Sequence, residues 1–288
     1  MMFCMSRDFL ELYLKRVPTF FGAGDNYEDS EYVVFGVPFD STVSFIPGCR
    51  FGPLAIRIFS EQISIPELNE NSLKIADMGD VLQTLKVSVM LKRVKRIVEK
   101  IFSDGKKPII LGGEHTLTLS SLEALSKFTK PAIVIFDSHL DLLDEYLDSR
   151  INHATWLRRY LEKKKGVVAT IGYRDFTKEE LEYGKDKIDL MISSEEILDN
   201  PRNAVEKMRD FVENVGSVYV SVDVDVLGAI GVSNPTLTGT TYKQIINILN
   251  ILKHKIIGID VVEVNPLLDH GLTAVYACYI IGHVLSRN

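Results

Sequence analysis

Acidic residues and histidines gather in three short motifs of this sequence, and their types suit the binding of metal ions. Residues 137–141 (DSHLD) carry ligand-type side chains at alternate positions, and residues 223–225 (DVD) repeat that spacing with two carboxylates. Residues 112–115 (GGEH) add a second imidazole. Because alternate side chains of an extended segment point to one side, we expect each motif to present its ligands together.

Four carboxylates and two imidazoles in one place would repel one another and be poorly solvated without a cation. The set is rich in oxygen and lacks sulfur, which favours manganese, or iron or cobalt, over a closed structural zinc site. Six ligands are too many for one ion with an open position, whereas two ions about 3.5–4 Å apart can share carboxylates and hold a hydroxide. The sequence therefore predicts a binuclear centre with the ligands His115, Asp137, His139, Asp141, Asp223 and Asp225.

Short runs rich in valine and isoleucine alternate along the chain with segments of helical periodicity. The expected strands are residues 32–37, 109–111, 132–136, 167–171, 190–192, 217–222 and 256–262. The expected helices are residues 87–102, 117–128, 155–162, 201–212 and 242–252. Uninterrupted apolar strands are typical of a parallel sheet buried on both faces. The alternation therefore predicts an α/β fold, a single-domain three-layer α/β/α arrangement with a mostly parallel sheet.

The three ligand motifs follow three of the expected strands, and Glu263 directly follows a fourth, residues 256–262. In a parallel sheet the carboxyl ends of the strands form the binding crevice, so these side chains are expected to converge. A single aspartate at a strand end is usually a cap, but buried strands rarely tolerate so many acids without a partner. His153 follows the DSHLD motif after a short acidic loop, and we expect it to reach the mouth of the same crevice.

Length and composition fit one globular domain and exclude several classes of protein. The 288 residues carry a net charge of -6 and show no linker or repeat, so we expect a single domain over 1–288 without a nucleic-acid partner. No apolar run approaches the ~18 residues of a membrane helix. The N-terminus lacks a signal-peptide pattern, and its Phe9, Leu10, Tyr13 and Leu14 suggest one face of a short surface helix. The three scattered cysteines suggest a reducing, cytoplasmic location.

Taken together, these motifs resemble those of the ureohydrolase family of arginases and agmatinases. The segments VPFDSTVSFIPGCRFGPLAIR, LGGEHTLTL, FDSHLDLLDE, INHATWLRR, SVDVDVLG and GIDVVEVNP follow one another in the family's order along nearly the whole chain. The resemblance implies an eight-stranded sheet, two Mn²⁺ per chain and a homo-oligomer, either a trimer or a hexamer. It implies a hydrolase that cuts a guanidino group from a small molecule and releases urea.

The resemblance also implies a role for each site residue. One manganese would be held by His115, Asp137, Asp141 and Asp223, and the other by Asp137, His139, Asp223 and Asp225. Asp141 would thereby belong to the catalytic centre, where a hydroxide between the ions attacks the guanidinium carbon. Glu263 would orient the guanidinium, and His153 would carry protons at the mouth of the crevice.

The sequence departs from the family at Leu140, Val226 and Ile230, which concerns the loop over 226–239 and the substrate end of the site more than the metals. Leu142 and Leu143 stand where arginases place polar residues that hold the amino-acid end of arginine. The loop that follows, with Asp144, Glu145 and Asp148, would attract the ammonium of agmatine and repel a carboxylate, so agmatine is the expected substrate, yielding putrescine and urea.

Other functions remain open at this point. Arg150 is either a binding group for a carboxylate substrate or a surface ion-pair partner, so arginase, guanidinobutyrase and formimidoylglutamase activities are alternatives. An inactive metal-binding member of the family is a second class of alternative. A deacetylase-like enzyme with one zinc ion is a third, which metal counting would separate from the binuclear centre.

Overall fold

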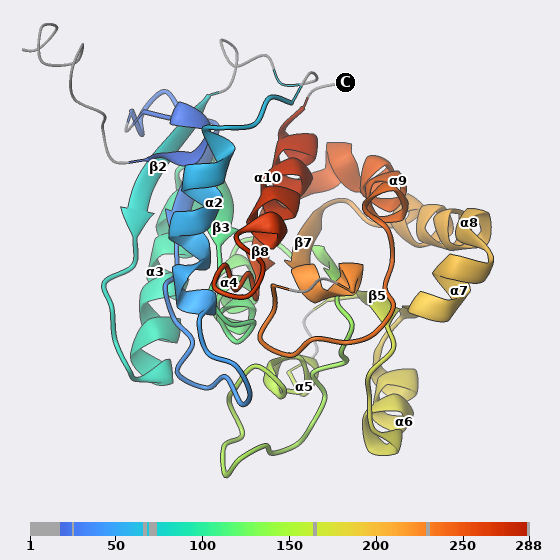
Figure 1. The fold of residues 1–288 in the computed structure, drawn as a ribbon. Coiled ribbons are helices and arrows are strands. Elements are labelled where there is room, and N and C mark those ends of the chain that lie inside the picture. Colours follow the sequence, from blue (N-terminus) through green and yellow to red (C-terminus); the bar gives the residue numbers. More distant parts are fainter. Residues whose placement is uncertain are drawn as a thin grey trace, which may run out of the picture.

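The computed structural model describes residues 18–24, 26–65, 68, 74–163, 166–228 and 231–286. Its centre is one eight-stranded sheet with helices on both faces (Figure 1). The strand order is β2-β1-β3-β8-β7-β4-β5-β6, and every neighbouring pair is parallel. The strands are β1 (Tyr32–Gly36), β2 (Ile75–Asp80), β3 (Lys107–Leu111), β4 (Ala132–Phe136), β5 (Val168–Tyr173), β6 (Leu190–Ser193), β7 (Val218–Asp223) and β8 (Ile256–Val262).

The seven strands expected from the apolar runs are all present, with ends that differ by at most two residues. The pattern missed β2, whose sequence IADMGD contains two aspartates and a glycine. It lies at the edge of the sheet, and its last three residues are exposed. An edge strand of this kind lacks the continuous apolar signal of a central strand, because half of its surroundings are solvent.

Two helical layers bury the two faces of the sheet. On β4, Ala132, Val134 and Phe136 belong to one core and Ile133 and Ile135 to the other. The first core is covered by α2 (Gly52–Ser60), α7 (Ser194–Asp199), α8 (Pro201–Glu213), α9 (Tyr242–Leu252) and α10 (Leu272–Leu285). The second is covered by α3 (Val87–Ser103), α4 (Leu117–Leu125) and α5 (Trp156–Leu161), and α6 (Lys178–Lys187) contacts it through Tyr183. The three-layer α/β/α prediction is confirmed.

The helix patterns predicted five helices, and each is found with ends displaced by three residues or fewer. Pro201 stands at the first position of α8, where its missing N–H costs nothing. Among the described residues, periodicity did not predict the helices α2, α6, α7 and α10. The last is apolar all round, with nine buried residues, so it lacks the amphipathic signal of a surface helix.

The predictions on membrane helices, cysteines, the N-terminus and domain number are tested only where the structure describes the residues concerned. Among the described residues, no helix is long and apolar enough to cross a membrane. Cys49 and Cys278 are buried and unpaired. The N-terminal helix face expected at residues 9–14 lies outside the described residues, as do Cys4 and Ile230. That the whole of 1–288 forms one domain stays a prediction.

A close approach of two loops fixes the backbone at the end of β3. A Cβ atom on Gly113 would lie 2.0 Å from the carbonyl oxygen of Phe39, and one on Gly112 would lie 2.5 Å from Val262 Cγ1. Neither position can take a side chain without moving main chain or a neighbouring strand. The Gly-Gly turn therefore sets how residues 39–51 and His115 lie against each other.

We expect Gly113→Ala to destabilise the protein by about 1–3 kcal/mol, because the added methyl group overlaps main-chain atoms of Phe39 that cannot rotate away. Urea unfolding measures the difference. Gly216→Ala is the matched control, since a Cβ atom there meets nothing within 4 Å, and its stability should stay within about 0.5 kcal/mol. Equal stability of the two variants would contradict the close approach.

Candidate metal centre

The six expected ligands lie together at the carboxyl ends of the four central strands, β3, β8, β7 and β4. His115 follows β3, residues 137–141 follow β4, and Asp223 is the last residue of β7. Glu263 follows β8 between them. The four strands are neighbours in the sheet although they are far apart in the sequence, so strand order alone brings these groups to one place.

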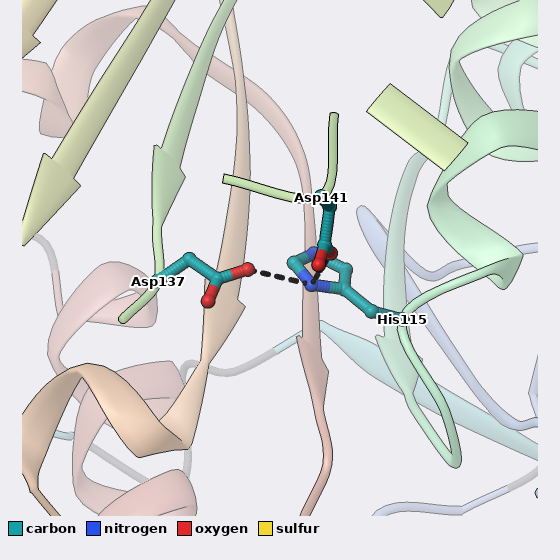
Figure 2. A group of neighbouring side chains, drawn as sticks. All are labelled: His115, Asp137 and Asp141. Carbon is teal, nitrogen blue, oxygen red and sulfur yellow. Dashed lines mark ion pairs between the residues drawn. The ribbon is translucent and has the colours of Figure 1, made fainter. Parts of the chain in front are cut away.

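One group of ligand atoms surrounds the imidazole of His115 (Figure 2). Its Nδ1 atom lies 2.9 Å from Asp137 Oδ2, 3.3 Å from Asp141 Oδ2 and 3.5 Å from Asp223 Oδ2. Two of these carboxylates, Asp137 and Asp141, come from the segment after β4, and the third, Asp223, comes from the end of β7. All four side chains are at most 9% exposed, so water contributes little to their solvation.

A second group surrounds His139 and shares a residue with the first. His139 Nδ1 lies 2.9 Å from Asp225 Oδ2 and 3.6 Å from Asp137 Oδ1. Asp137 thus offers one oxygen to each imidazole, and both candidate ligand groups include it. The His139 side chain is 25% exposed, which leaves this second group open to solvent.

The local backbone differs from the extended segments that the spacing suggested. Strand β4 ends at Phe136, and Asp141 has a left-handed backbone with φ of 53°. Asp225 lies in the short 3₁₀ helix η4 (Val224–Leu227) rather than in a strand. The argument from alternate positions is therefore wrong, and tight turns at the strand ends make the side chains converge instead.

Main-chain hydrogen bonds orient the carboxylates. Asp137 Oδ1 accepts from the backbone N–H of His139 at 2.7 Å, and Asp223 Oδ1 accepts from that of Asp225 at 2.9 Å. Asp225 Oδ1 accepts from the backbone N–H of Ser138 at 2.9 Å. Asp223 and Asp225 each present Oδ2 to an imidazole, whereas Asp137 presents Oδ2 to His115 and Oδ1 to His139. The turns that carry the ligands thus also fix which oxygen of each ligand points inward.

The charge balance of the centre favours a bound cation. Burial and the charge of Asp137 raise the pKa of Asp141 to about 6. Burial, with the charges of Asp225 and Asp137, raises the pKa of Asp223 well above its usual range. Conversely, the pKa of His115 is raised well above its usual range, because Asp137, Asp141 and Asp223 outweigh the opposing effect of burial. The raised pKa values of Asp141 and Asp223 reflect the cost of holding several buried carboxylates together, a cost that a bound cation would offset.

The residues fit a divalent ion on two further observations. The buried Nδ1 atom of His115 makes no hydrogen bond, although three carboxylate oxygens lie nearby. The donors are oxygens and imidazole nitrogens without sulfur, which suits manganese and similar hard or borderline ions. His115, Asp137, Asp141, His139 and Asp225 could hold such ions, with Asp223 beside the first group.

Glu263 lies beside this centre without being one of its ligand groups. Its Oε1 atom accepts a hydrogen bond from the backbone N–H of His115 at 2.8 Å, and its backbone is left-handed with φ of 63°. Burial, with the charge of Glu114, raises the pKa of Glu263 to about 8. It lines a small cavity of about 20 Å³ together with His115, Asp223 and Asp225. The side chain therefore faces the same space as the ligands.

His153 also lies at this site, and contacts with the loop over 39–51 hold it there. Its Nε2 atom lies 3.2 Å from Ser44 Oγ, and its backbone N–H donates to Thr42 Oγ1 at 3.4 Å. Burial, with the positive charge of His139, lowers the pKa of His153 to about 4. Glu114 accepts hydrogen bonds from both the backbone and the hydroxyl of Thr42, so the acid of the GGEH motif anchors this loop.

The sequence analysis missed Thr42, Ser44 and Trp156. The indole N–H of Trp156 donates to Asp141 Oδ2 at 2.6 Å, and its ring centre lies 4.7 Å from that of His115. No spacing rule links these residues to the motifs, since their contacts arise from loops that fold over the strand ends. The length of the 39–51 loop and its serine and glycine content were the one available signal.

The centre opens into a larger cavity of about 520 Å³. Its lining includes both His139 and His153, together with Ser44, Phe45, Asp141, Leu143, Tyr146, Ala154, Asp175, Phe176, Thr177, Glu180, Asn234 and Pro235. His139, Asp141, His153 and Asn234 also line the small cavity, which therefore forms the floor of the large one.

The acids of the loop that was expected to attract the substrate, Asp144, Glu145 and Asp148, do not line this cavity, although Tyr146 of the same loop does. Asp144 instead pairs with Arg150 at 2.8 Å and with Arg159 at 2.6 Å. Arg150 is an ion-pair partner on the surface and lies outside the cavity, which decides between the two roles considered for it. Leu142 is fully buried in the core, and Leu143 alone of the two reaches the cavity.

Comparisons with known proteins agree with this geometry. The model of the arginase family matches residues 30–286. An agmatinase of Pyrococcus horikoshii is 33% identical over 91% of this chain and 93% of that protein. An N(1)-aminopropylagmatine ureohydrolase of Thermococcus kodakarensis is 34% identical over 82% of this chain and 83% of that protein. The crystal structure of an agmatine ureohydrolase of Thermoplasma volcanium superposes with a TM-score of 0.86 at 30% identity, covering 98% of this chain and 97% of the other.

Trp156 is the only tryptophan of the chain, so its fluorescence should report ion binding beside His115 and Asp141. We expect Mn²⁺ added to metal-free protein to quench this emission in a saturable way, because a paramagnetic ion would sit within a few ångströms of the indole. His115→Asn should weaken the quenching at least tenfold in apparent affinity. His254→Gln, at an exposed position, is the control and should behave as the unchanged protein. Unchanged quenching in His115→Asn would place the ion elsewhere.

Proposed function

This chain belongs to the arginase family, and from that membership we propose that it binds two Mn²⁺ and hydrolyses agmatine to putrescine and urea. Membership makes it a hydrolase that acts on guanidino compounds. The identity and number of the ions and the choice of agmatine are the proposed parts. The role of each site residue is proposed with them.

The observation that carries the proposal is the pair of ligand groups that share Asp137. Two groups with one carboxylate in common would hold two adjacent divalent ions, with Asp137 available to both. Asp223 lies beside the first group and would be a further ligand. When bound, two adjacent divalent ions supply Lewis acidity and lower the pKa of a water between them, which provides a nucleophile at neutral pH.

The remaining residues act on the substrate. Glu263 faces the small cavity, where its carboxylate can pair with the planar guanidinium by charge-assisted hydrogen bonds. Its bond from the His115 backbone fixes the direction of that carboxylate. His153 lines both cavities, so it can move a proton between the floor and the open mouth, where the amine leaves. Asp141 is proposed as a ligand whose position the Trp156 indole holds.

The lining of the large cavity supports an amine-bearing substrate. As far as the structure describes the chain, this lining contains, besides the proposed ligand Asp141, the acids Asp175 and Glu180 but neither lysine nor arginine. A substrate that ends in a carboxylate would find no lysine or arginine to pair with in this lining, whereas Asp175 and Glu180 would attract the ammonium group of agmatine. The charge of the cavity lining, and not that of the loop with Asp144, Glu145 and Asp148, therefore favours agmatine. An aminopropyl-bearing agmatine would satisfy the same charge requirement.

A homo-oligomer, trimeric or hexameric, and a cytoplasmic location complete the proposal. The first rests on the family resemblance. The second is supported by Cys49 and Cys278, which are buried and unpaired, as is usual in a reducing compartment. Neither affects the chemistry assigned to the site.

A urea-release assay on manganese-loaded protein tests the proposed function. We expect agmatine or N(1)-aminopropylagmatine to give a higher kcat/KM than arginine or guanidinobutyrate, with two ions per chain by elemental analysis. A preference for a carboxylate-bearing substrate would contradict the assignment of substrate. A limit of one ion would contradict the binuclear centre. Release of no urea from any compound would favour the inactive metal-binding alternative.

A single substitution in the lining tests whether the charge of the large cavity selects the substrate. Phe176 lines the cavity and is 39% exposed, so Phe176→Lys adds a cation there. The ratio of kcat/KM for agmatine to that for guanidinobutyrate should fall by about tenfold, since one added charge is worth on the order of 1 kcal/mol at such distances. Phe176→Leu controls for the loss of the ring and should leave the ratio unchanged. An unchanged ratio in Phe176→Lys would remove electrostatics from the specificity.

Glu263→Gln separates substrate orientation from metal binding. Because a hydrogen bond to a charged group contributes about 1.5–3 kcal/mol, and misplacing the guanidinium adds to the loss, kcat/KM should fall roughly ten- to a thousandfold. Metal content and melting temperature should stay near those of the unchanged protein. Lost metal would instead make Glu263 a ligand, and near-normal activity would remove it from the mechanism.

A further inference from the structure

A carboxylate outside the ligand set is buried in the middle of β8, one layer behind the metal centre. Asp260 has no exposed surface, and neither the fold nor the reaction assigned above requires an acid there. Burial raises its pKa, while the charge of His115 and three hydroxyl hydrogen bonds act in the opposite direction. A buried carboxylate is costly unless its hydrogen bonds serve it fully, so its partners indicate what it does.

The partners divide between the two oxygens of Asp260. Oδ2 accepts hydrogen bonds from the Tyr219 hydroxyl at 2.6 Å and from Thr118 Oγ1 at 3.1 Å. Oδ1 accepts from Ser221 Oγ. In the first branch, Tyr219 makes no hydrogen bond to His115, both of which the structure describes, and Thr118 Oγ1 lies 3.4 Å from Ser221 Oγ. The second continues, because Ser221 Oγ also lies 2.9 Å from His115 Nε2.

The position of the hydroxyl hydrogen of Ser221 decides which atoms donate and which accept in the second branch. Ser221 has one hydroxyl hydrogen, and it is directed to the carboxylate of Asp260. The contact with His115 therefore needs its hydrogen on Nε2, with Ser221 as the acceptor. A neutral imidazole with hydrogen on Nε2 carries a lone pair on Nδ1, the atom that faces Asp137, Asp141 and Asp223 without a hydrogen bond.

We propose that Ser221 and Asp260 are positioning residues that hold the His115 ring with its Nδ1 lone pair directed at the metal. This inference rests on the proposed metal centre. We call the chain of hydrogen bonds from His115 through Ser221 to Asp260 the relay. A hydrogen bond from the distal nitrogen of a ligand histidine to an acceptor fixes the tautomer and the ring orientation. Here a serine stands between the imidazole and the carboxylate. The Tyr219 branch only satisfies the second oxygen of Asp260.

The two branches offer a matched pair of variants. Ser221→Ala and Tyr219→Phe each remove one hydroxyl from Asp260, but only the first breaks the connection to His115. Affinity for Mn²⁺ can be measured on metal-free protein by the electron paramagnetic resonance of the free ion, with urea unfolding of the same preparations. Ser221→Ala should weaken one Mn²⁺ site ten- to a hundredfold, the usual loss for an outer-shell partner. Tyr219→Phe should change Mn²⁺ affinity by less than about threefold, even if it lowers stability.

Asp260→Asn gives a second test, because the asparagine side chain has nearly the same shape as that of aspartate. An asparagine can present N–H to Ser221, so Ser221 would then donate to His115 Nε2 and favour hydrogen on Nδ1, which blocks the metal. Its affinity for Mn²⁺ should fall as in Ser221→Ala, and this variant decides the matter if Ser221→Ala does not fold.

The possible results separate this inference from the proposed function. If the unchanged protein does not bind Mn²⁺, the proposed metal centre fails. If the unchanged protein binds Mn²⁺ and Ser221→Ala or Asp260→Asn binds it with the same affinity, the relay is overturned. An equal loss in Tyr219→Phe and Ser221→Ala would also overturn it, since that result would mean that Asp260 serves the packing of the core alone.

Discussion

Excess negative charge buried at one edge of the sheet is the constraint on which the rest of this structure depends. Asp137, Asp141, Asp223 and Asp225 are each at most 7% exposed, and two imidazoles lie among them. Such a cluster is unfavourable in a folded protein unless its charge is compensated. The strand order gathers these residues, the turns orient them and the loops cover them. Holding the carboxylates together in this way lowers the stability of the fold, and a bound cation would restore it.

Main chain and surrounding side chains make this cluster rigid before any ion binds. Backbone N–H groups hold Oδ1 of Asp137, Asp223 and Asp225, and Trp156 holds Asp141. Two of the residues at the site, Asp141 and Glu263, adopt left-handed backbone conformations that are unfavourable for residues other than glycine. Strain of this kind persists only where neighbouring contacts over-determine it, and here those contacts fix the positions of reactive groups.

The covering loops connect the metal centre to the space above it. The loop over 39–51 is tied down at both ends, by Thr42 on Glu114 and by Asn265, whose amide donates to the carbonyl oxygens of Ile46 and Pro47. It brings Ser44 to His153 at the edge of the large cavity. The same loop therefore lines the large cavity through Ser44 and Phe45 and sets the position of the group proposed to carry protons.

The sequence by itself determined the fold class and singled out the six candidate ligands, because buried parallel strands have an apolar pattern that acids at their ends interrupt. It did not determine β2, which is polar at the sheet edge, or α10, which is apolar all round. Only the tertiary structure decided that the acids of that loop lie outside the lining of the cavity, where Asp144 pairs with Arg150 of the same loop and with Arg159 of α5. The tertiary structure likewise brought Trp156, Ser221 and Asp260 to the ligands, because contacts across strands and loops depend on strand order and burial, and spacing along the chain carries information about neither.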